Sequence, residues 1–181
     1  MPKDFIIHCL TGEFVTDMSD ASSTLCFDVA HRDWSERVIE AIGLRPANFP
    51  RLAEGSAAAG ALRLPLQREW GVDGPVMVAA GASRPAAMAV GLGALKAGDA
   101  FVTLGETTLA GVTTRAPRAL TDGAVRNLCH CLPGLWQQQS GLPAGMRSLE
   151  WCAALMGVAD PHDLFDAARR PPAELSMGSS K

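Results

Sequence analysis

The chain has 181 residues, of which 48% are hydrophobic and 19% charged, a balance that excludes a disordered protein and allows one domain or parts of two. Its formal net charge is −3, with 16 basic and 19 acidic residues interspersed, so no basic surface for nucleic acid is expected. No stretch approaches the roughly 20 apolar residues of a membrane span and the opening residues lack a secretion-signal pattern, so we expect a cytoplasmic protein without membrane contact.

The first residues predict a helix followed by a polar loop. Residues 2–10 are apolar and helix-compatible, and Gly12 permits the turn that ends a helix. Residues 13–28 are rich in Ser, Thr and Asp, which predicts a loop with short extended pieces. We expect four side chains to organise this loop by capping backbone groups, namely Asp17, Ser19, Asp20 and Ser22.

The next segment predicts two short helices joined by a surface connection. Asp33 followed by Glu36 resembles a capping box, which favours a helix over residues 34–42. Residues 45–60 carry prolines, glycines and an alanine run, and are expected to form the connection. A short helix is predicted around residues 66–70.

The middle of the chain has the pattern of a strand, a turn and a helix, followed by a hairpin. Residues 75–80 (PVMVAA) form a short apolar run of strand type, and residues 86–95 are small, apolar and helix-compatible. The turn GASRP lies between them. Two further strands, over residues 99–104 and 109–114, predict a hairpin closed by a glycine turn, which can direct backbone N–H groups at a phosphate.

The last third predicts a strand that contains Trp136 and a helix over residues 147–156. A final helix is expected over residues 161–170, followed by a loose tail. Trp136 is interpreted as a core or interface residue.

Cysteine and histidine residues do not predict a metal or catalytic site. Five cysteines, an odd number, are scattered along the chain, which indicates reduced thiols. Cys129, His130 and Cys131 alternate across a strand and have no second ligand pair nearby, so no metal site is expected. No carboxylate or cysteine partner at catalytic spacing is found for the isolated histidines His8, His31 and His162.

Several blocks of this sequence occur together in one protein family. They are PKDFIIHCLTGEFVTDMSDASSTLCFDVAHRDW, FPRLAEGSAAAGAL, AVGLGALKAGDAFVTLG and CHCLPGLWQQ. In this order and approximate spacing they resemble the FGGY carbohydrate kinases, and within that family the xylulokinases. The resemblance covers nearly everything from Pro2 to about Met156.

The resemblance implies an α/β protein with part of the actin-like ATPase (ribonuclease H-like) fold. In such kinases two domains hold the sugar in the cleft between them, and the second domain binds most of the ATP. Residues 1–94 would then be the C-terminal part of the first, sugar-side domain. Residues 95–181 would be the N-terminal part of the second, nucleotide-side domain, truncated, so the chain is expected to hold only the middle of the family's fold.

The resemblance also locates the general base, and here the sequence departs from the family. The family's aspartate lies in a GGGDN-type turn, which corresponds to residues 81–85, and its position is occupied by Arg84. A general base must accept the proton of the attacking hydroxyl, and arginine stays protonated. No catalytic residue is therefore assigned. Arg84 is open to two interpretations: a phosphate-binding residue or a solvated surface residue.

A second departure lies in the hairpin turn, where the family reads GTSG. This chain has Gly105, Glu106, Thr107 and Thr108. Glu106 places negative charge near a polyphosphate, and the second glycine is lost. We expect Gly105, Thr107 and Thr108 to retain at most a weakened contact to the nucleotide phosphates; the alternative is an ordinary hairpin turn.

The resemblance implies ATP-dependent phosphorylation of D-xylulose to xylulose 5-phosphate, with ATP and Mg²⁺ as cofactors. Its partners would be a small ketose and ATP, without nucleic acid or membrane. Because the base is replaced and both ends of the family's fold are missing, the isolated chain is expected to be inactive. The alternatives are a non-catalytic remnant that acts as an interaction module and self-associates, or an enzyme completed in trans.

Overall fold

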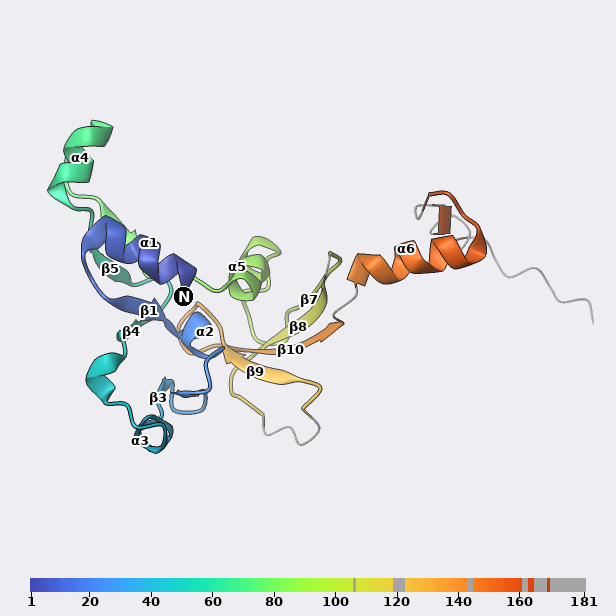
Figure 1. Ribbon diagram of the computed structural model, residues 1–181, viewed down its shortest axis with the longest axis horizontal. Coiled ribbons are helices and arrows are strands. Elements are labelled where there is room, and N and C mark those ends of the chain that lie inside the picture. Colours follow the sequence, from blue (N-terminus) through green and yellow to red (C-terminus); the bar gives the residue numbers. More distant parts are fainter. Residues whose placement is uncertain (106, 119–122, 143–144, 161–162, 165–168, 170–181) are drawn as a thin grey trace, which may run out of the picture. The chain divides into compact units, whose positions relative to one another are not determined.

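The computed structural model describes residues 1–105, 107–118, 123–142, 145–160, 163–164 and 169 (Figure 1). They form two compact units. Unit 1 comprises Met1–Val102 and Ala110–Ser140, and unit 2 comprises Thr103–Leu109 and Gly141–Lys181. None of the helices in these ranges is both long and apolar enough to cross a membrane.

The elements follow one another as short helices and strands. The first half contains α1 (Pro2–Thr11), β1 (Val15–Asp17), α2 (Met18–Ala21), β2 (Phe27–Asp28), β3 (Asp33–Trp34), α3 (Glu36–Ala41), the 3₁₀ helix η1 (Pro46–Asn48), β4 (Arg51–Ala53), β5 (Ala58–Ala61) and α4 (Leu64–Trp70). The second half contains β6 (Met77–Ala79), α5 (Arg84–Gly91), β7 (Ala100–Thr103), β8 (Thr108–Thr114), β9 (Arg126–Cys129), β10 (Trp136–Leu142) and α6 (Gly145–Met156).

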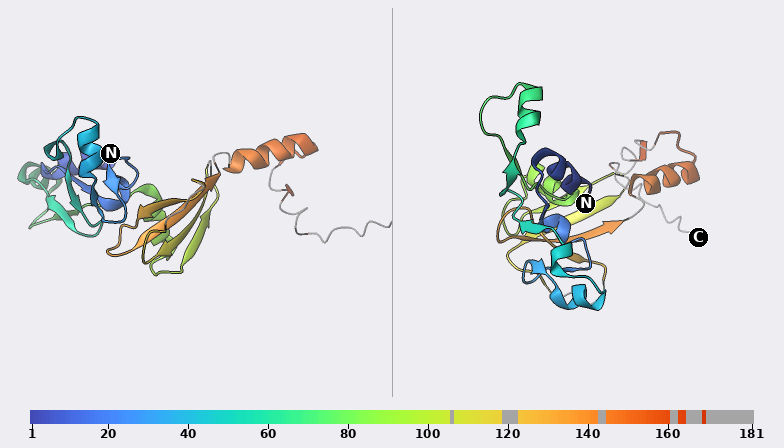
Figure 2. Two further views of the ribbon diagram at one scale, coloured as in Figure 1. Left: turned by 90° about the horizontal axis from the view of Figure 1, so that it is seen from below. Right: turned by 60° about the vertical axis from the view of Figure 1, so that its left-hand side comes forward.

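The strands that the structure describes form three small pairs and one larger sheet. β1 and β4 are parallel, with Thr16 opposite Leu52. β2–β3 and β5–β6 are antiparallel pairs. The larger sheet has the order β7-β8-β10-β9, and β9 and β10 are antiparallel, with Trp136 opposite Cys129. α1 packs on β1, β5 and β6, as Figures 1 and 2 show.

Two hydrophobic clusters hold unit 1 together. The first lies between α1 and the two strand pairs beneath it and consists of Ile7, Val15, Ala53, Ala59 and Ala80, with Val78 against it. The second joins α2, β2 and β9 and consists of Ala21, Phe27 and Cys129, with Met18, Val29, Trp34, Leu52 and Trp136 packed around it. The second cluster therefore packs α2 against β9, two elements that are distant in the sequence.

Most of the predicted elements are confirmed. α1 ends at Gly12, whose φ of 87° is left-handed and whose N–H donates to the carbonyl of His8 at 2.7 Å. α4, β6, α5, β10 and α6 all overlap their predicted ranges. The hairpin of β7 and β8 is confirmed by their adjacency and by a bond from Thr113 N–H to the Asp99 carbonyl at 2.8 Å. The helix and tail predicted from residue 161 onward fall mostly outside the described residues.

Some local structure differs from the prediction. The helix expected over residues 34–42 is confirmed as α3, but its start was wrong: it begins at Glu36 with Ser35 as its N-cap, because Asp33 and Trp34 form β3. Trp34 is held there by an edge contact to Phe27, with 5.8 Å between ring centroids. The capping box does not form, since the N-cap is Ser35 and no side-chain bond caps it. The connection expected over residues 45–60 contains β4 and β5, whose pairing depends on partners distant in sequence. The short helix α2 was also missed.

Candidate functional site

The GASRP turn lies between β6 and α5 and is held by main-chain contacts. Gly81 has a φ of 82°, a conformation that favours glycine, and its N–H donates to the Gly55 carbonyl at 3.0 Å. A Cβ on Gly55 would lie 2.4 Å from the Gly81 carbonyl oxygen and 2.7 Å from Cys131. Glycine at 55 therefore lets three chain segments pass in contact at the turn.

Arg84 is the first residue of α5 and its side chain is exposed. Ser83 is the N-cap, with an extended backbone and without a capping bond from its own side chain. Both interpretations of Arg84, phosphate binding and solvation, remain predictions. At physiological pH the guanidinium supplies a positive charge and no proton acceptor at this position.

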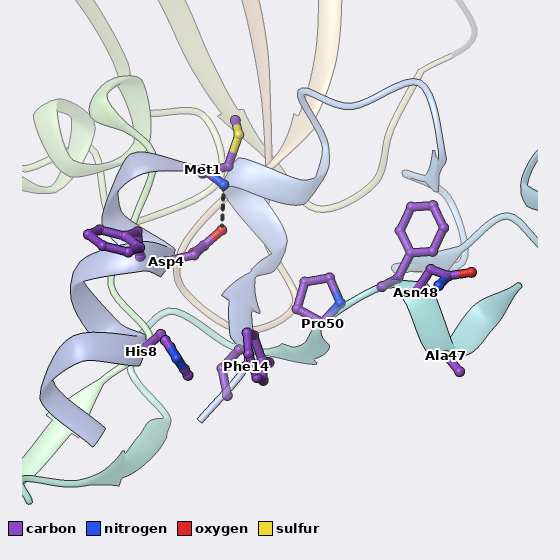
Figure 3. Close-up of a pocket in the computed structure, with 10 residues that line it drawn as sticks. Met1, Asp4, His8, Phe14, Ala47, Asn48 and Pro50 are labelled. Atoms are coloured by element: carbon purple, nitrogen blue, oxygen red, sulfur yellow. Dashed lines mark ion pairs between the residues drawn. The ribbon is translucent and has the colours of Figure 1, made fainter. Parts of the chain in front are cut away.

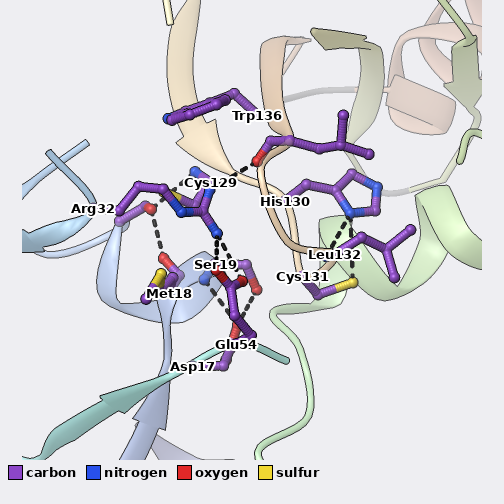
Figure 4. A network of polar contacts seen from close by, with 12 residues as sticks. Asp17, Met18, Ser19, Arg32, Glu54, Cys129, His130, Cys131, Leu132 and Trp136 are labelled. Atoms are coloured by element: carbon purple, nitrogen blue, oxygen red, sulfur yellow. Dashed lines mark hydrogen bonds and ion pairs between the residues drawn. The ribbon is translucent and has the colours of Figure 1, made fainter. Parts of the chain in front are cut away.

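A buried chain of polar contacts leads from α1 to this turn. The N–H of Ser83 donates to Ser19 Oγ at 2.9 Å, and Ser19 Oγ donates in turn to Asp17 Oδ2. The other oxygen, Asp17 Oδ1, pairs with Lys3 Nζ at 2.8 Å. Asp17 and Ser19 are both 0% exposed, so these contacts are shielded from solvent. Figure 4 shows the link between Asp17 and Ser19.

Of the four residues predicted to cap local backbone, Asp17 and Ser22 are confirmed, whereas the Ser19 hydroxyl contacts Asp17 and the remote Ser83, and the Asp20 side chain pairs with Lys3. Asp17 caps α2, since its Oδ2 accepts from the N–H groups of Ser19 at 2.8 Å and Asp20 at 3.4 Å. Ser22 Oγ donates to the Met18 carbonyl at 2.6 Å and accepts from Cys129 N–H at 2.9 Å. α2 thus uses its two serines to bind two remote segments of backbone.

Three carboxylates surround the Lys3 ammonium. Nζ lies 2.5 Å from Asp4, 2.8 Å from Asp17 and 3.4 Å from Asp20. Burial opposes the charge on Lys3, but its contacts to Asp17 and Asp4 outweigh this and raise the pKa of Lys3 above its ordinary value. Burial raises the pKa of Asp20, although Lys3 opposes that shift. Lys3 thus compensates the buried charge of Asp17.

A second polar group joins the β2–β3 loop to the end of β4 and the start of β10 (Figure 4). Arg32 Nη2 donates to both carboxylate oxygens of Glu54, at 2.9 and 2.7 Å, and Nη1 donates to the Leu135 carbonyl at 3.0 Å. The guanidinium also lies 5.0 Å from the ring centroid of Trp136. Arg32 and Glu54 were not predicted as site residues, because nothing in their local spacing indicates that they meet. The core role predicted for Trp136 is confirmed by its packing in the second cluster.

Cys129, His130 and Cys131 are all buried. His130 is 0% exposed, and its Nδ1 accepts the N–H of Leu132 at 3.0 Å. Burial lowers the pKa of His130, partly offset by the Ala94 carbonyl. Burial also raises the pKa of the Cys129 and Cys131 thiols, which favours their protonated form.

The remaining histidines differ in their surroundings. His31 has a carboxylate partner, since its Nδ1 lies 2.8 Å from Asp28 Oδ2, so the expectation that it lacks one was wrong. Asp28 also accepts the backbone N–H of His31 at 3.1 Å, so the pair closes a surface turn. His8 stacks on Phe14, with 4.2 Å between ring centroids. His162 lies outside the described residues.

The predicted phosphate-binding residues belong to unit 2. The Gly105 carbonyl accepts the N–H of Met146 in the first turn of α6 at 2.8 Å. Thr107 is exposed, and Thr108 begins β8. Glu106 lies outside the described residues. The backbone of this turn is therefore attached to α6, while the Thr107 hydroxyl is open to solvent.

Two pockets in unit 1 lie near the candidate site or beside α1 and could hold a ligand. One of about 630 Å³ is formed by α1, β1 and η1 (Figure 3), with His8, Phe14 and Phe49 among its walls and an ion pair of 3.1 Å between Asp4 and the Met1 amino group at its edge. The other, of about 400 Å³, adjoins the GASRP turn. Its lining consists of small or apolar residues, without a carboxylate or imidazole among them: Gly55, Ser56, Gly81, Ala82, Ala87, Val90, Cys131 and Leu132.

Comparison with known proteins gives consistent matches. The family model described as the FGGY family of carbohydrate kinases, N-terminal domain, matches residues 1–91. The xylulose kinase of Escherichia coli (strain K12) is 36% identical over 170 residues, which are 94% of this chain and 35% of that protein. The xylulose kinase of Klebsiella pneumoniae is 36% identical over 169 residues, with 93% and 35% covered.

Solved structures agree with these matches. A kinase from Brucella ovis, described as a xyloylose kinase, superposes with a TM-score of 0.87 at 38% identity, over 92% of this chain and 34% of that one. The ligand-bound xylulose kinase of Lactobacillus acidophilus shares the fold, with a TM-score of 0.82 at 18% identity. The chain thus spans about a third of the length of the relatives it matches.

Proposed function

Because the chain belongs to the FGGY family of carbohydrate kinases and has part of their actin-like ATPase fold, we propose that it carries a xylulokinase-like scaffold without the catalytic base. The reaction of that scaffold would be transfer of phosphate from ATP to D-xylulose, giving xylulose 5-phosphate. Two relatives that are 36% identical to the chain are xylulose kinases, which supports this choice of sugar. Reduced thiols and the use of ATP support a cytoplasmic location.

We propose a domain boundary near residue 94. Residues 1–94 would contribute to the sugar-side domain and residues 95–181 to the nucleotide-side domain. The match of the N-terminal domain model to residues 1–91 supports this division. Under this division, α5 and the GASRP turn would lie at the end of the first domain, beside the cleft that such kinases use.

The observation that carries the proposal is Arg84 at the position of the general base. The attacking hydroxyl must lose its proton as its oxygen bonds to phosphorus, and a carboxylate at residue 84 would accept that proton. Arginine cannot do so. The loss of a general base reduces the rate by typically ~10²- to 10⁴-fold, so we propose that the chain by itself is inactive.

The described residues fit a nucleotide only in part. Gly105, Thr107 and Thr108 would face the phosphates of ATP, and the exposed Thr107 hydroxyl suits such a contact. Glu106 opposes it by charge, worth about 1 kcal/mol for two charges ~4 Å apart in water. Among the described residues no three His, Cys, Asp or Glu side chains gather as metal ligands, so Mg²⁺ would be held through the nucleotide. Bound ATP would supply the phosphoryl group, and Mg²⁺ would neutralise its charge.

A second candidate is a non-catalytic interaction module. The observation that favours it is apolar surface: Phe5, Phe14 and Leu25 are 66%, 71% and 91% exposed. Exposed apolar side chains of this size favour association with another protein or a second copy. Under this alternative the chain self-associates in solution and gains no activity from any change at residue 84.

The test uses a chimaeric enzyme in which this chain replaces the matching segment of the Escherichia coli xylulose kinase. We expect no ADP above a blank from the chain alone with ATP, Mg²⁺ and D-xylulose, in a host lacking that kinase. The chimaera with Arg84 should be inactive, and Arg84→Asp should raise kcat by roughly 10²-fold or more.

Arg84→Ala is the matched control, because it removes the positive charge without supplying a base. Recovery with Arg84→Asp alone supports the missing base. Equal recovery with both variants assigns the defect to charge repulsion and contradicts the proposal. Activity of the chimaera with Arg84 intact also contradicts the proposal. If the chimaeras with Arg84, Arg84→Asp and Arg84→Ala are all inactive and the chain by itself forms oligomers, the interaction module is favoured.

A further inference from the structure

We infer that Asp17 and Ser19 are positioning residues for the GASRP turn: the bond from Ser83 N–H to Ser19 Oγ, which joins residues 64 positions apart, sets the backbone that leads into residue 84. Their importance for catalysis rests on the proposed function, since it depends on residue 84 being the position of the base. The structural part of the inference stands on contacts within unit 1 alone.

The inference begins with the backbone of Ser83. Ser83 immediately precedes Arg84 and is the N-cap of α5. Its N–H donates to Ser19 Oγ at 2.9 Å, in a pair that is buried on both sides. A buried N–H without an acceptor is costly, so this bond selects the orientation of the peptide that enters α5.

The Ser19 hydroxyl is in turn oriented by Asp17. A hydroxyl has one proton, and Ser19 donates it to Asp17 Oδ2, which leaves its lone pairs directed at Ser83 N–H. The backbone N–H of Ser19 donates to the same carboxylate oxygen at 2.8 Å. Asp17 thereby fixes both the position and the polarity of the acceptor that Ser83 uses.

Asp17 can perform this role only as a carboxylate, and Lys3 supplies the compensating charge. Asp17 is 0% exposed, so water cannot replace its partners. Lys3 Nζ lies 2.8 Å from its second oxygen and is itself partly exposed. A continuous polar path therefore runs from the α1 ammonium to the peptide before residue 84.

The identity of residue 84 does not enter this path. The Arg84 side chain is exposed, and the turn is held by Ser19 and by the Gly55 carbonyl. The turn can thus keep its geometry with arginine at a position where the family has aspartate. The conformation of the turn should therefore stay the same when Arg84 is replaced by aspartate.

α2 contains a matched control. Ser22 is also buried, and its Oγ accepts a backbone N–H from a remote segment, that of Cys129 at 2.9 Å. Ser19→Ala removes a hydroxyl from α2, and Ser22→Ala removes one from the C-cap residue of the same helix. Only Ser19→Ala removes the acceptor of the turn.

The first measurement is amide hydrogen exchange in the full chain, read residue by residue by NMR. In the unsubstituted chain Ser83 N–H should be protected. Ser19→Ala should speed its exchange by roughly tenfold or more relative to Ser22→Ala, which should instead act on Cys129. Rapid exchange of Ser83 N–H in the unsubstituted chain overturns the inference without any variant having to fold.

The second measurement reads the geometry at residue 84 itself. An imidazole introduced by Arg84→His at the first turn of α5 should titrate below its ordinary pKa of about 6.5, because the helix N-terminus disfavours a cation there. Adding Ser19→Ala should move its pKa back toward that value, and adding Ser22→Ala should leave it unchanged. Equal effects of the two serine variants would reduce Ser19 to a general stabilising residue and contradict the inference. Neither the hydrogen exchange nor the imidazole pKa depends on kinase activity, so both measurements test this inference even if the proposed function is wrong.

Discussion

Two buried polar groups in unit 1 differ in whether each of their side-chain polar atoms has a hydrogen-bond or ion-pair partner. At the GASRP turn, Asp17 Oδ2 and the Ser19 hydroxyl are hydrogen-bonded. Asp17 Oδ1 has no hydrogen bond among the described residues, but it is paired with the Lys3 ammonium at 2.8 Å. On β10, Gln137 and Gln139 are also buried, and Gln139 Nε2 donates to Gln137 Oε1 at 2.7 Å. There, Gln137 Nε2 and Gln139 Oε1 find no acceptor or donor among the described residues.

The difference shows which buried polarity supports the structure. A partnered group costs stability when it is removed, because its partners are left unsatisfied. A group with unpartnered atoms already carries that cost, so its replacement by apolar side chains should be favourable. Substitutions at the two places should therefore change stability in opposite directions.

The largest effect is expected for Asp17→Ala. The change leaves the Ser19 hydroxyl, two backbone N–H groups and one contact of Lys3 unsatisfied, and breaking a buried ion pair costs about 3–5 kcal/mol. Urea unfolding followed by circular dichroism measures it. Asp73→Ala, at an exposed position, is the control and should change stability by less than about 0.5 kcal/mol. Similar losses for both variants would show that the network is not a source of stability.

A smaller effect of opposite sign is expected for the double variant Gln137→Met/Gln139→Met. It removes both amides together, so neither is left without its partner, and the free energy of unfolding should rise by about 1–2 kcal/mol. The same unfolding assay applies. Gln138→Met, which changes the half-buried residue between them, is the control. A loss of stability in the double variant would mean that the amides have partners after all.

The smallest effect is expected from His130 and depends on pH. Burial lowers its pKa below the ordinary 6.5, so the unfolded chain binds the proton more readily than the folded one. The stabilising contribution is complete above 6.5 and is lost as pH falls toward the lowered value. His130→Asn keeps an acceptor for Leu132 N–H but cannot titrate, so melting temperatures should fall less between about pH 7.5 and 5.5 than in the unsubstituted chain. An unchanged slope would contradict this origin of the acid sensitivity.

Much of the candidate site was visible in the sequence. The GASRP turn and the start of α5 follow from a strand-type run, a glycine and a small-residue helix, all of which are local signals. The capping by Asp17 and Ser22 follows from residue types that favour such turns. The contact of Arg32 with Glu54 was not predictable, since it joins two loops 22 residues apart without a shared pattern.

The sequence by itself determined the family, the helices with clear periodicity and the arginine at residue 84, because these depend on residue identity and near neighbours. Only the tertiary structure decided the β1–β4 pairing, the strand conformation of Asp33 and Trp34 where a helix start was predicted, and the bond from Ser83 to Ser19. Those features require groups distant in the chain to meet in a buried place, where each unpaired N–H or carboxylate must find a partner. Which groups meet depends on how distant segments pack, so the sequence of one segment does not predict it.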